Sequence, residues 1–531
     1  MQKELEEYRW WQKGIIYQVY PRSFKDASGD GTGDLQGIMQ KLDYLAWLGV
    51  DAVWVSPIYP SPMDDFGYDI TDYTGIEPLF GSMQDFDELL HLIHQKGMKL
   101  ILDLVPNHTS YLHPWFKESR SSRDNPRRDW YIWRDPAPDG GPPNNWQSVF
   151  GGSGWEWDEE TGQYYYHAFL KEQPDLNWRN PDVKKAMFDV MRFWLEKGVD
   201  GFRVDVIWHL MKDHLFRDNP PNPDYIEGEP DIKRYLNAYS EDQPGVHDII
   251  AGMRKVMDPY GERLLIGEIY LPIGRLVTYY GKEGAGVHLP FNFQLIQVAW
   301  DAESIYALVN EYEGSLLPGN WPNWVLGNHD KDRVLSRIGE QQARLAAVLL
   351  LTLRGTPTMY YGDEIGMHDV HIPPERIQDP KELTMPGYSR DPQRTPMQWS
   401  NAAYAGFSET EPWLPLADDY QARNVETEKE AAGSMLSLYK RLIEVRKQEP
   451  ALQVGDFIPL GLQGQLMVFK RIHNGAGVLV AINFGKEKAV YQSETKLQGE
   501  ILISVSGKPE GRLVADSISI EGEDAVVVRL D

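Results

Sequence analysis

The alternation of short apolar runs with amphipathic, helix-like segments constrains this chain most. Such apolar runs are typical of parallel strands that are covered on both faces. Eight of them occur, at residues 15–20, 52–59, 99–108, 201–208, 264–270, 286–293, 323–330 and 356–364. Helical patterns with start or stop signals occur at 35–49, 82–97, 180–198, 340–355 and 433–452. We therefore predict an α/β chain that folds as a (β/α)8 TIM barrel rather than an open sheet.

Two intervals are too long for simple connections between a strand and a helix. The first follows the third strand and is rich in Pro, Gly, Asn and Trp, which predicts a small inserted domain at 109–175. The second, at 363–430, is a long excursion after strand eight. From 455 to 531 short β runs replace the helices and predict an antiparallel β-sandwich domain. The barrel itself is then assigned to 1–108 and 176–454.

Composition excludes several classes of function. The chain of 531 residues carries a formal net charge of −26, which repels phosphate backbones, so we expect no nucleic acid partner. It has no Cys, which excludes disulfides, thiolate metal sites and a Cys nucleophile. The first residues, MQKELEEYRWWQKG, lack a signal-peptide core, and no run of 18 apolar residues exists. We expect a cytoplasmic protein with no membrane association, and the oligomeric state stays open.

Polar side chains stand at the ends of several predicted strands. They are Asn107 and His108 on the third strand, Arg203 and Asp205 on the fourth, Glu268 on the fifth, and Asn328, His329 and Asp330 on the seventh. In a barrel the carboxyl ends of the strands face the active site. These side chains should therefore converge on one site.

The acids in this set narrow the chemistry. Asp205, Glu268 and Asp330 supply the pair of carboxyl groups that glycoside hydrolysis needs, one as nucleophile and one as proton donor. The third acid can bind ring hydroxyls or raise the pKa of the proton donor by like-charge proximity. The many Trp, Tyr and Phe residues suit stacking on sugar faces.

Other chemistries find less support. The run LGNHD also occurs in metallophosphoesterases, but the D-x-H and GDxxD motifs of that class are missing upstream. A metal-dependent barrel hydrolase needs H-x-H on the first strand, which reads IYQVYPR here. No GxGxxG, P-loop or G-x-S-x-G motif follows a strand.

The motifs together resemble the α-amylase family of glycoside hydrolases (glycoside hydrolase family 13), in its α-glucosidase and oligo-1,6-glucosidase branch. The resemblance covers nearly the whole chain. It rests on WWQKGIIYQVYPRSF, DDFGYDITDY, DLVPNHTS, QPDLNW, GFRVDV, GEIY, GNHD and RTPMQW, which occur in the family's order. One such motif is weak, whereas all of them in order are specific.

The resemblance implies the roles of the three acids. Asp205 matches the nucleophile that forms a covalent glucosyl-enzyme intermediate, and Glu268 matches the general acid/base. Asp330 matches the acid that binds the 2- and 3-hydroxyls of the strained sugar. The reaction would retain configuration, with the first two carboxyl groups about 5–5.5 Å apart.

The resemblance also implies substrate contacts around the first sugar. His108, Arg203 and His329 match contacts to hydroxyls and to the nucleophile, and Tyr68 matches an aromatic platform. Asp65 and Arg394 match a pair that closes the pocket against the terminal 4-hydroxyl. Aromatic wall positions from the inserted domain match Phe150 and Phe169.

A closed pocket predicts exo attack from the non-reducing end that releases single glucose units. Val206 after the nucleophile and the run QPDLN are typical of the α-1,6 enzymes, but Trp208 stands where the family usually has Asn. We expect hydrolysis of short maltose- and isomaltose-type sugars, extending to sucrose- or trehalose-type sugars, with some transglycosylation. A glucosyltransferase or an isomaltulose- or trehalose-forming isomerase is the alternative. A silent binding subunit would lack one of the acids.

The run DASGDGTGD at 26–34 places oxygen donors at alternating positions around a Gly turn. They are Asp26, Ser28, Asp30, the carbonyl of Thr32, and Asp34. Such ligands suit Ca²⁺ or Mg²⁺, and the run resembles the structural cation loop of this branch. A metal-free Asp/Gly turn is the alternative. No organic cofactor is expected.

Overall fold

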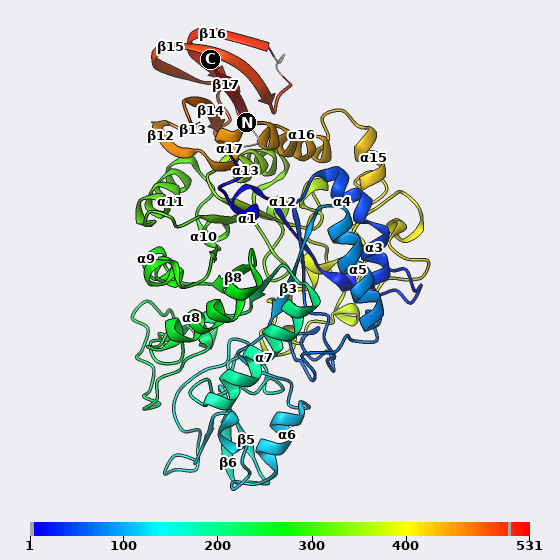
Figure 1. The fold of residues 1–531 in the computed structure, drawn as a ribbon, viewed down its shortest axis with the longest axis vertical. Helices are drawn as coiled ribbons and strands as arrows, with labels where there is room; N and C mark the ends of the chain where they lie inside the picture. Colours follow the sequence, from blue (N-terminus) through cyan, green and yellow to red (C-terminus); the bar gives the residue numbers. More distant parts are fainter. Residues whose placement is uncertain (1–4, 508–510) are drawn as a thin grey trace.

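The computed structural model describes residues 5–507 and 511–531, and eight parallel strands form its centre (Figure 1). Their order around the sheet is β10-β11-β1-β2-β3-β7-β8-β9, and β9 contacts β10, so the sheet closes. The strands are β1 (Ile16–Val19), β2 (Ala52–Val55), β3 (Lys99–Leu104), β7 (Gly201–Val204), β8 (Leu264–Ile269), β9 (Leu289–Asn292), β10 (Asn323–Val325) and β11 (Thr356–Tyr360). The predicted (β/α)8 barrel is confirmed.

Each strand is shorter than the apolar run that predicted it. The run 201–208, for example, continues past β7 into a 3-10 turn at Ile207–His209. Asp205 and Val206 connect the two, and Val206 has φ 37° and ψ 46°. The strand therefore ends one residue before the predicted nucleophile, which lies on the loop at the mouth of the barrel.

Three long helices follow the predicted boundaries closely. α5 (Met83–Gln95) begins at Ser82, whose hydroxyl oxygen accepts a hydrogen bond from the Asp85 amide in a capping box. α7 (Pro181–Lys197) begins at Asn180 and ends at Gly198, which is left-handed at φ 107°. α13 (Glu340–Thr352) matches the pattern at 340–355. Local capping chemistry thus set the start of α5 and both ends of α7.

Two predicted helices are each divided. The segment 35–49 forms α3 (Leu35–Gln40) and α4 (Leu42–Leu48). The segment 433–452 forms α16 (Met435–Gln448) and α17 (Pro450–Val454), because Pro450 cannot donate the backbone hydrogen bond that would continue α16.

The other helices are α1 (Trp10–Lys13), α2 (Pro21–Phe24), α6 (Pro114–Ser121), α8 (Val246–Met257), α9 (Ile273–Leu276), α10 (Gln294–Gln297), α11 (Ala302–Ser315), α12 (Val334–Ile338), α14 (Lys381–Thr384) and α15 (Val425–Glu430).

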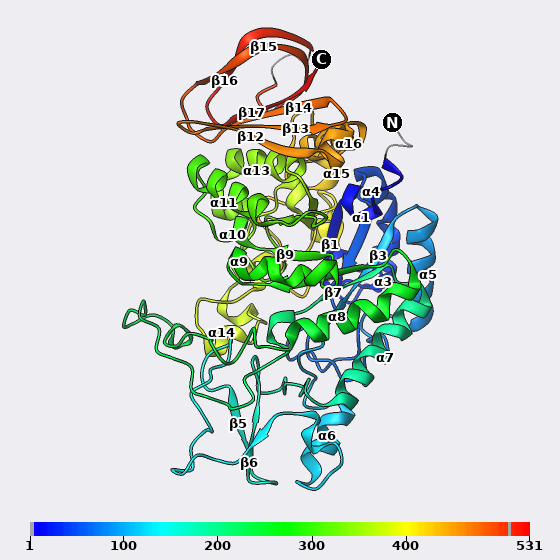
Figure 2. The same cartoon turned by 60° about the vertical axis from the view of Figure 1, so that its left-hand side comes forward.

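A small antiparallel sheet lies within the segment assigned to the inserted domain. It consists of β4 (Trp133–Arg134), β6 (Gln163–Tyr166) and β5 (Trp155–Asp158), in that order. Figures 1 and 2 place it at one end of the molecule, with the C-terminal strands at the other. Because the insertion leaves the carboxyl end of β3, it lies over the mouth of the barrel.

The C-terminal strands form one six-stranded antiparallel sheet, in the order β12-β13-β14-β17-β15-β16. They are β12 (Asp456–Gln463), β13 (Leu466–His473), β14 (Ala476–Asn483), β15 (Ala489–Ser504), β16 (Gly511–Ile520) and β17 (Asp524–Leu530). The sheet curls over itself (Figure 2), and apolar side chains of β13, β14, β16 and β17 share one core. The expected sandwich is thus a single folded sheet. The sequence did not predict β15, because most of its residues are polar.

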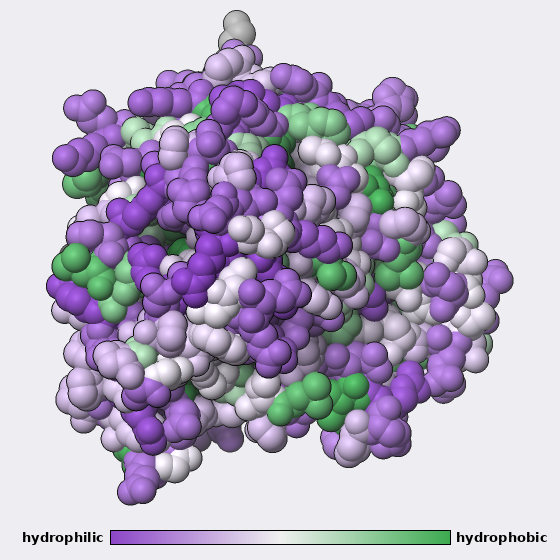
Figure 3. Space-filling view, turned by 90° about the horizontal axis from the view of Figure 1, so that it is seen from below, coloured by the Kyte–Doolittle hydropathy of each residue, from purple (hydrophilic) through white to green (hydrophobic). Residues whose placement is uncertain are grey.

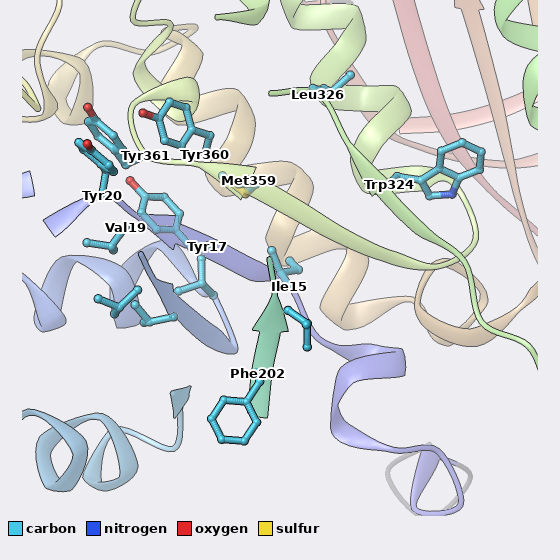
Figure 4. Packing of buried hydrophobic residues seen from close by; sticks show 14 of the residues in the cluster. Ile15, Tyr17, Val19, Tyr20, Phe202, Trp324, Leu326, Met359, Tyr360 and Tyr361 are labelled. Carbon is cyan, nitrogen blue, oxygen red and sulfur yellow. The ribbon is translucent and has the colours of Figure 1, made fainter. Parts of the chain in front are cut away.

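The main core lies between the barrel and its helices. Tyr17, Tyr20, Tyr360 and Tyr361, drawn in Figure 4, belong to one buried cluster with Phe202. Hydrophilic side chains cover most of the face in Figure 3, as a charge of −26 requires. No helix within the described residues is long and apolar enough to cross a membrane.

Candidate active site

One buried arginine organises the acids at the mouth of the barrel. Arg203 lies late on β7, and its Nη1 is 2.7 Å from both Asp103 Oδ1 and Asp205 Oδ1. Its Nη2 is 2.6 Å from Glu268 Oε2. The Arg203 side chain is fully buried, so the charges offset one another's desolvation. The predicted nucleophile and proton donor are therefore held on a single guanidinium group.

The backbone after Asp205 is strained. Val206 has φ 37°, which is an outlier for a β-branched residue. Its amide donates a hydrogen bond of 2.9 Å to Glu268 Oε2. The strained residue therefore ties the loop that carries Asp205 to the carboxyl group of the proton donor.

The acids around Arg203 titrate as a group. Burial raises the pKa of Asp205 well above its usual range against the opposing effect of Arg203, and the neighbouring Glu268 and Asp103 raise it further. Burial also raises the pKa of Asp103 to about 6. Because like charges this close cannot all ionise easily, the cluster around Arg203 favours a mixture of ionised and protonated acids. One carboxylate and one carboxylic acid are what a nucleophile and a proton donor require.

Asp330 lies in a separate cationic environment. Its Oδ1 is 2.7 Å from Arg394 Nη2 and 3.4 Å from Arg390 Nη1. Burial opposes its ionisation, but the adjoining His329 ring and the two arginines hold the pKa of Asp330 well below its usual range. Asp330 is therefore an ionised acceptor suited to sugar hydroxyls.

The two histidines are neutral and have defined partners. Burial lowers the pKa of His108 to about 4 and that of His329 to about 3. Gln18 Nε2 donates to His329 Nδ1 at 2.8 Å, which leaves the proton on Nε2, 3.3 Å from Asp330. The Tyr68 ring stacks on His329 with a centroid distance of 5.3 Å and an angle of 7°. The predicted platform and histidine are thus adjacent.

The pair at the closed end of the cavity differs from the prediction. Asp65 Oδ1 lies 2.7 Å from Arg390 Nη2, not from Arg394. Gln173 Nε2 donates to the other Asp65 oxygen at 3.1 Å. A 3-10 turn at Asp391–Arg394 separates the two arginines and directs Arg394 towards Asp330 and the His329 carbonyl, 2.8 Å away. The expected Asp65–Arg394 pair is therefore corrected to Asp65–Arg390.

A cavity of about 350 Å³ contains most of the predicted site. It is lined by Asp65, Tyr68, His108, Phe150, Phe169, Asp205, Glu268 and Asp330. Arg203, His329 and Arg394 lie behind this wall and contact the acids.

Sequence reasoning missed other lining residues: Val149, His209, Ile232, Asn237, Glu241, Tyr270, Lys331, Lys381 and Arg390. Of these, Tyr270 is the last residue of the GEIY motif and Lys331 directly follows GNHD, so both could have been included.

The loop at 26–34 uses its carboxylates within the protein. Asp26 accepts hydrogen bonds from the amides of Gly29 and Gly31, and Asp34 accepts from Ala27, Ser28 and Gly37. Asp30 accepts from the Thr32 amide at 2.8 Å. Within the described residues, no three acidic or histidine side chains form a group that could hold a metal ion. The cation at this loop therefore stays a prediction.

The fold and the paired acids at its mouth define a barrel enzyme that acts on carbohydrates. The family model for the α-amylase catalytic domain matches residues 18–455. The chain therefore belongs to the α-amylase family of glycoside hydrolases.

Individual relatives refine this placement. A salivary α-glucosidase of Anopheles gambiae is 41% identical over 522 residues, covering 94% of this chain and 88% of that protein. An oligo-1,6-glucosidase of Parageobacillus thermoglucosidasius is 39% identical over 527 residues, covering 91% and 92%. The predicted branch is thus confirmed, and the chain is a glycoside hydrolase of the α-glucosidase type.

Solved structures with this fold include a glucosyl transfer enzyme and a trehalulose synthase. An α-glucosyl transfer enzyme, XgtA, superimposes with a TM-score of 0.93 at 39% identity, covering 99% of this chain and all of that chain. The trehalulose synthase MutB of Pseudomonas mesoacidophila MX-45 has a TM-score of 0.92 at 34% identity, covering 98% and 99%. Fold alone therefore does not separate hydrolysis from transfer.

Proposed function

We propose that this protein is a retaining, exo-acting α-glucosidase that hydrolyses short α-glucosides from the non-reducing end. The observation that carries the proposal is the sharing of Arg203 by Asp205 and Glu268, whose oxygens lie 2.7 and 2.6 Å from its nitrogens. Both carboxyl groups therefore lie against one guanidinium group. This arrangement supports the short separation of retaining enzymes, about 5–5.5 Å, rather than that of inverting ones.

In the first step, an Asp205 oxygen attacks the anomeric carbon while Glu268 gives its proton to the departing glycosidic oxygen. The ion pair with Arg203 favours the charged form of Asp205 and opposes the rise in its pKa that burial causes. In the second step, Glu268 takes a proton from water, and the water oxygen displaces Asp205 from the anomeric carbon. Asp330 and the Nε2–H of His329 bind hydroxyls of the same sugar.

The exo mode rests on the Asp65–Arg390 pair. Both residues line the cavity, and Arg390 also contacts Asp379 at 2.7 Å, which fixes its position. A polysaccharide chain cannot pass through an end closed by such a buried ion pair. Only a terminal glucose fits, so single glucose units are the expected product.

Maltose- and isomaltose-type sugars are the proposed substrates, extending to sucrose- and trehalose-type sugars. Transfer to a second sugar is the proposed side reaction, since water and sugar hydroxyls compete for one intermediate. The similarity to XgtA and MutB favours transfer or isomerisation as the second candidate. The chain has no Arg-Leu-Asp-Arg-Asp run, which is typical of sucrose isomerases, and this supports hydrolysis.

Product analysis tests this function. The protein is incubated with maltose, isomaltose, sucrose and trehalose, and the products are separated by chromatography while NMR follows the anomer first released. We expect glucose, formed initially as the α-anomer. Absence of glucose from every substrate, or β-glucose as first product, would contradict the proposal, and an isomeric disaccharide as main product would favour the isomerase.

The cytoplasm is the proposed location, supported by the absence of Cys. Relatives named salivary show that the family also acts elsewhere. Fractionation of the source cells, with the activity assayed in each fraction, decides between these locations.

A further inference from the structure

A second cavity, of about 310 Å³, lies between the inserted domain and the loops of the barrel. Its walls come from β4 and β6, from residues 176–179 before α7, and from residues 210–216 after β7. Among the described residues, none lines both this cavity and the one that holds the acids. The volume is at the lower end of the range for small-molecule sites, and the proposed function makes no use of it.

Basic side chains dominate the lining of this cavity, although acids outnumber bases in the whole chain by 79 to 53. A concave wall with one sign of charge attracts small ions of the opposite sign. Within the described part of the chain, the basic lining residues are Arg123, Arg128, Arg134, Arg179, Lys212 and His214, and the acidic one is Asp129.

Two of these cations are already paired with carboxylates. Arg123 Nη1 lies 3.2 Å from Asp135 Oδ1, and Lys212 Nζ lies 2.5 Å from Asp175 Oδ2. These two residues therefore add little net charge to the cavity.

Three arginines of the lining have only neutral partners. Arg128 donates to the Gln163 side chain at 2.6 Å, Arg134 to the Trp133 carbonyl at 2.8 Å, and Arg179 to the Lys212 carbonyl at 2.8 Å. In residues 5–507 and 511–531 none of the three forms an ion pair with a carboxylate. A guanidinium group keeps its charge in proteins, so three positive charges around this cavity lack a counter-charge in contact.

Aromatic rings hold two of these guanidinium groups in place. The Arg128 Cζ lies 3.4 Å from the centre of the Trp133 ring, and the Arg134 Cζ lies 3.6 Å from the centre of the Phe216 ring. Stacked guanidinium groups lose less freedom when a ligand binds.

Arg134 and Arg179 have accessible donors, because both residues are exposed. In the described chain the guanidinium group of each makes one hydrogen bond, which leaves four of its five N–H groups available. Arg128 is half-buried and uses its Nη atoms on Ser119, Thr161 and Gln163, so it contributes charge rather than donors.

We propose that this cavity binds a phosphate group, either as the free ion or on a sugar phosphate, with Arg134 and Arg179 donating to its oxygens and Arg128 adding charge. Planar guanidinium groups match the geometry of phosphate oxygens. The inference goes beyond the proposed α-glucosidase function and does not depend on it, because binding can be measured without turnover.

Isothermal titration of the intact protein in a phosphate-free buffer of low ionic strength tests the site. The probes are inorganic phosphate and glucose 6-phosphate, and we expect one molecule of probe per chain. Arg134→Gln and Arg179→Gln should each raise Kd by about 10-fold to 100-fold, as for the loss of hydrogen bonds to a charged group. Binding of glucose 6-phosphate at least about 10-fold tighter than that of phosphate would identify a sugar phosphate, and equal binding the free ion.

Arg127→Gln is the matched control. Arg127 precedes Arg128 and its Cζ also lies over a ring, 4.6 Å from the centre of Trp130, but it pairs with Glu118 at 3.2 Å outside the cavity lining. Its Kd should equal that of the unmodified protein. Absence of saturable binding of both probes, or an equal rise in Kd in all three variants, would overturn the proposal.

The unmodified protein supplies a second test that does not depend on a variant that folds. Phenylglyoxal modifies accessible arginines, and mass spectrometry measures the rate at each one. With a probe at ten times its Kd, the rates at Arg134 and Arg179 should fall by about 10-fold, while the rate at Arg127 should not change. Unchanged rates at Arg134 and Arg179 would overturn this site and leave the proposed α-glucosidase function intact, whereas failure to release glucose from any α-glucoside would overturn only that function.

Discussion

Buried arginines lie at both ends of the barrel, and they have different partners. At the mouth, Arg203 contacts three carboxyl groups at 2.6–2.7 Å. At the base, Arg446 donates to the carbonyls of Leu351 and Gly355, and Arg471 donates to that of Gly455. At the base, the arginines therefore supply hydrogen-bond donors to buried backbone carbonyls where α13 meets β11 and the C-terminal sheet. Carboxyl partners leave an acid pair ready to react.

The pKa values follow the same division. At the base, burial lowers the pKa of Arg446 to about 10, because the charge of Asp51 offsets it only in part. At the mouth, burial also opposes the charge on Arg203, but Asp103 and Glu268 outweigh it and raise the pKa of Arg203 well above its usual range. The same residue type thus stabilises the fold at one end and the reactive acids at the other.

Exchanging Arg203 and Arg471 for Met, one at a time, should give the largest effects, on kcat in one case and on the free energy of unfolding in the other. Arg203→Met leaves the acids without their cation, so kcat should fall by at least about 1000-fold. Arg471→Met should keep kcat but lower the free energy of unfolding by about 3 kcal/mol, because buried carbonyls lose their donors. Steady-state kinetics and urea unfolding measure both. Near-normal turnover in Arg203→Met would break the comparison.

Opening the closed end of the cavity should have the next largest effect. Arg390→Ala removes the partner of Asp65, so kcat/KM for maltose should fall by about 10-fold to 100-fold. With maltoheptaose labelled at the reducing end, products longer than glucose should appear. The control is Arg376→Ala, since Arg376 pairs with Glu411 outside the cavity lining. Glucose as the sole product of Arg390→Ala would contradict the role of the pair.

A buried acid away from the mouth should contribute to the pH dependence of stability. Burial raises the pKa of Glu428 to about 7, so the folded state binds more protons than the unfolded state between pH 4.5 and 7. The stability from this group is complete below about pH 4.5 and is lost as the pH rises through 7. Glu428→Gln should flatten this slope by up to about 1.4 kcal/mol per pH unit.

Urea unfolding at several pH values measures that slope. Glu426→Gln is the control, because Glu426 is exposed on the same helix. An equal change in both variants would show that Glu428 is not the source.

Removal of a bound cation should have the smallest effect. If the loop at 26–34 binds Ca²⁺ or Mg²⁺, elemental analysis finds about one ion per chain, and chelation lowers Tm by a few degrees. The kcat of the folded enzyme should not change, because the loop does not line the cavity. Protein purified without chelator that contains no metal would favour the turn held by amide hydrogen bonds alone.

The barrel and its acids were predictable because they follow local rules. Strand and helix signals repeat, and Asp205, Glu268 and Asp330 stand where barrel strands end. The correct partner of Asp65 was not predictable, since Arg390 and Arg394 lie four residues apart in one irregular segment and a 3-10 turn selects between them. The position of a side chain in such a segment depends on tertiary packing.

Glu241 and β15 show two other limits. Glu241 lies in a connection without periodicity, and only the fold brings it to Trp208. The mostly polar sequence of β15 (Ala489–Ser504) has only short apolar runs, such as the three residues at 501–503, and β15 pairs with β16 and β17. Sequence therefore predicted what is set locally, and missed what distant segments impose.

Trapping of the covalent intermediate tests the central claim most directly. The protein is incubated with 5-fluoro-α-D-glucosyl fluoride, which slows release of the bound sugar, and then digested and mapped by mass spectrometry. We predict one fluoroglucosyl group per chain, attached to Asp205, and none on Asp205→Asn. A label on another residue, or no label while the enzyme still turns over α-glucosides, would contradict the account.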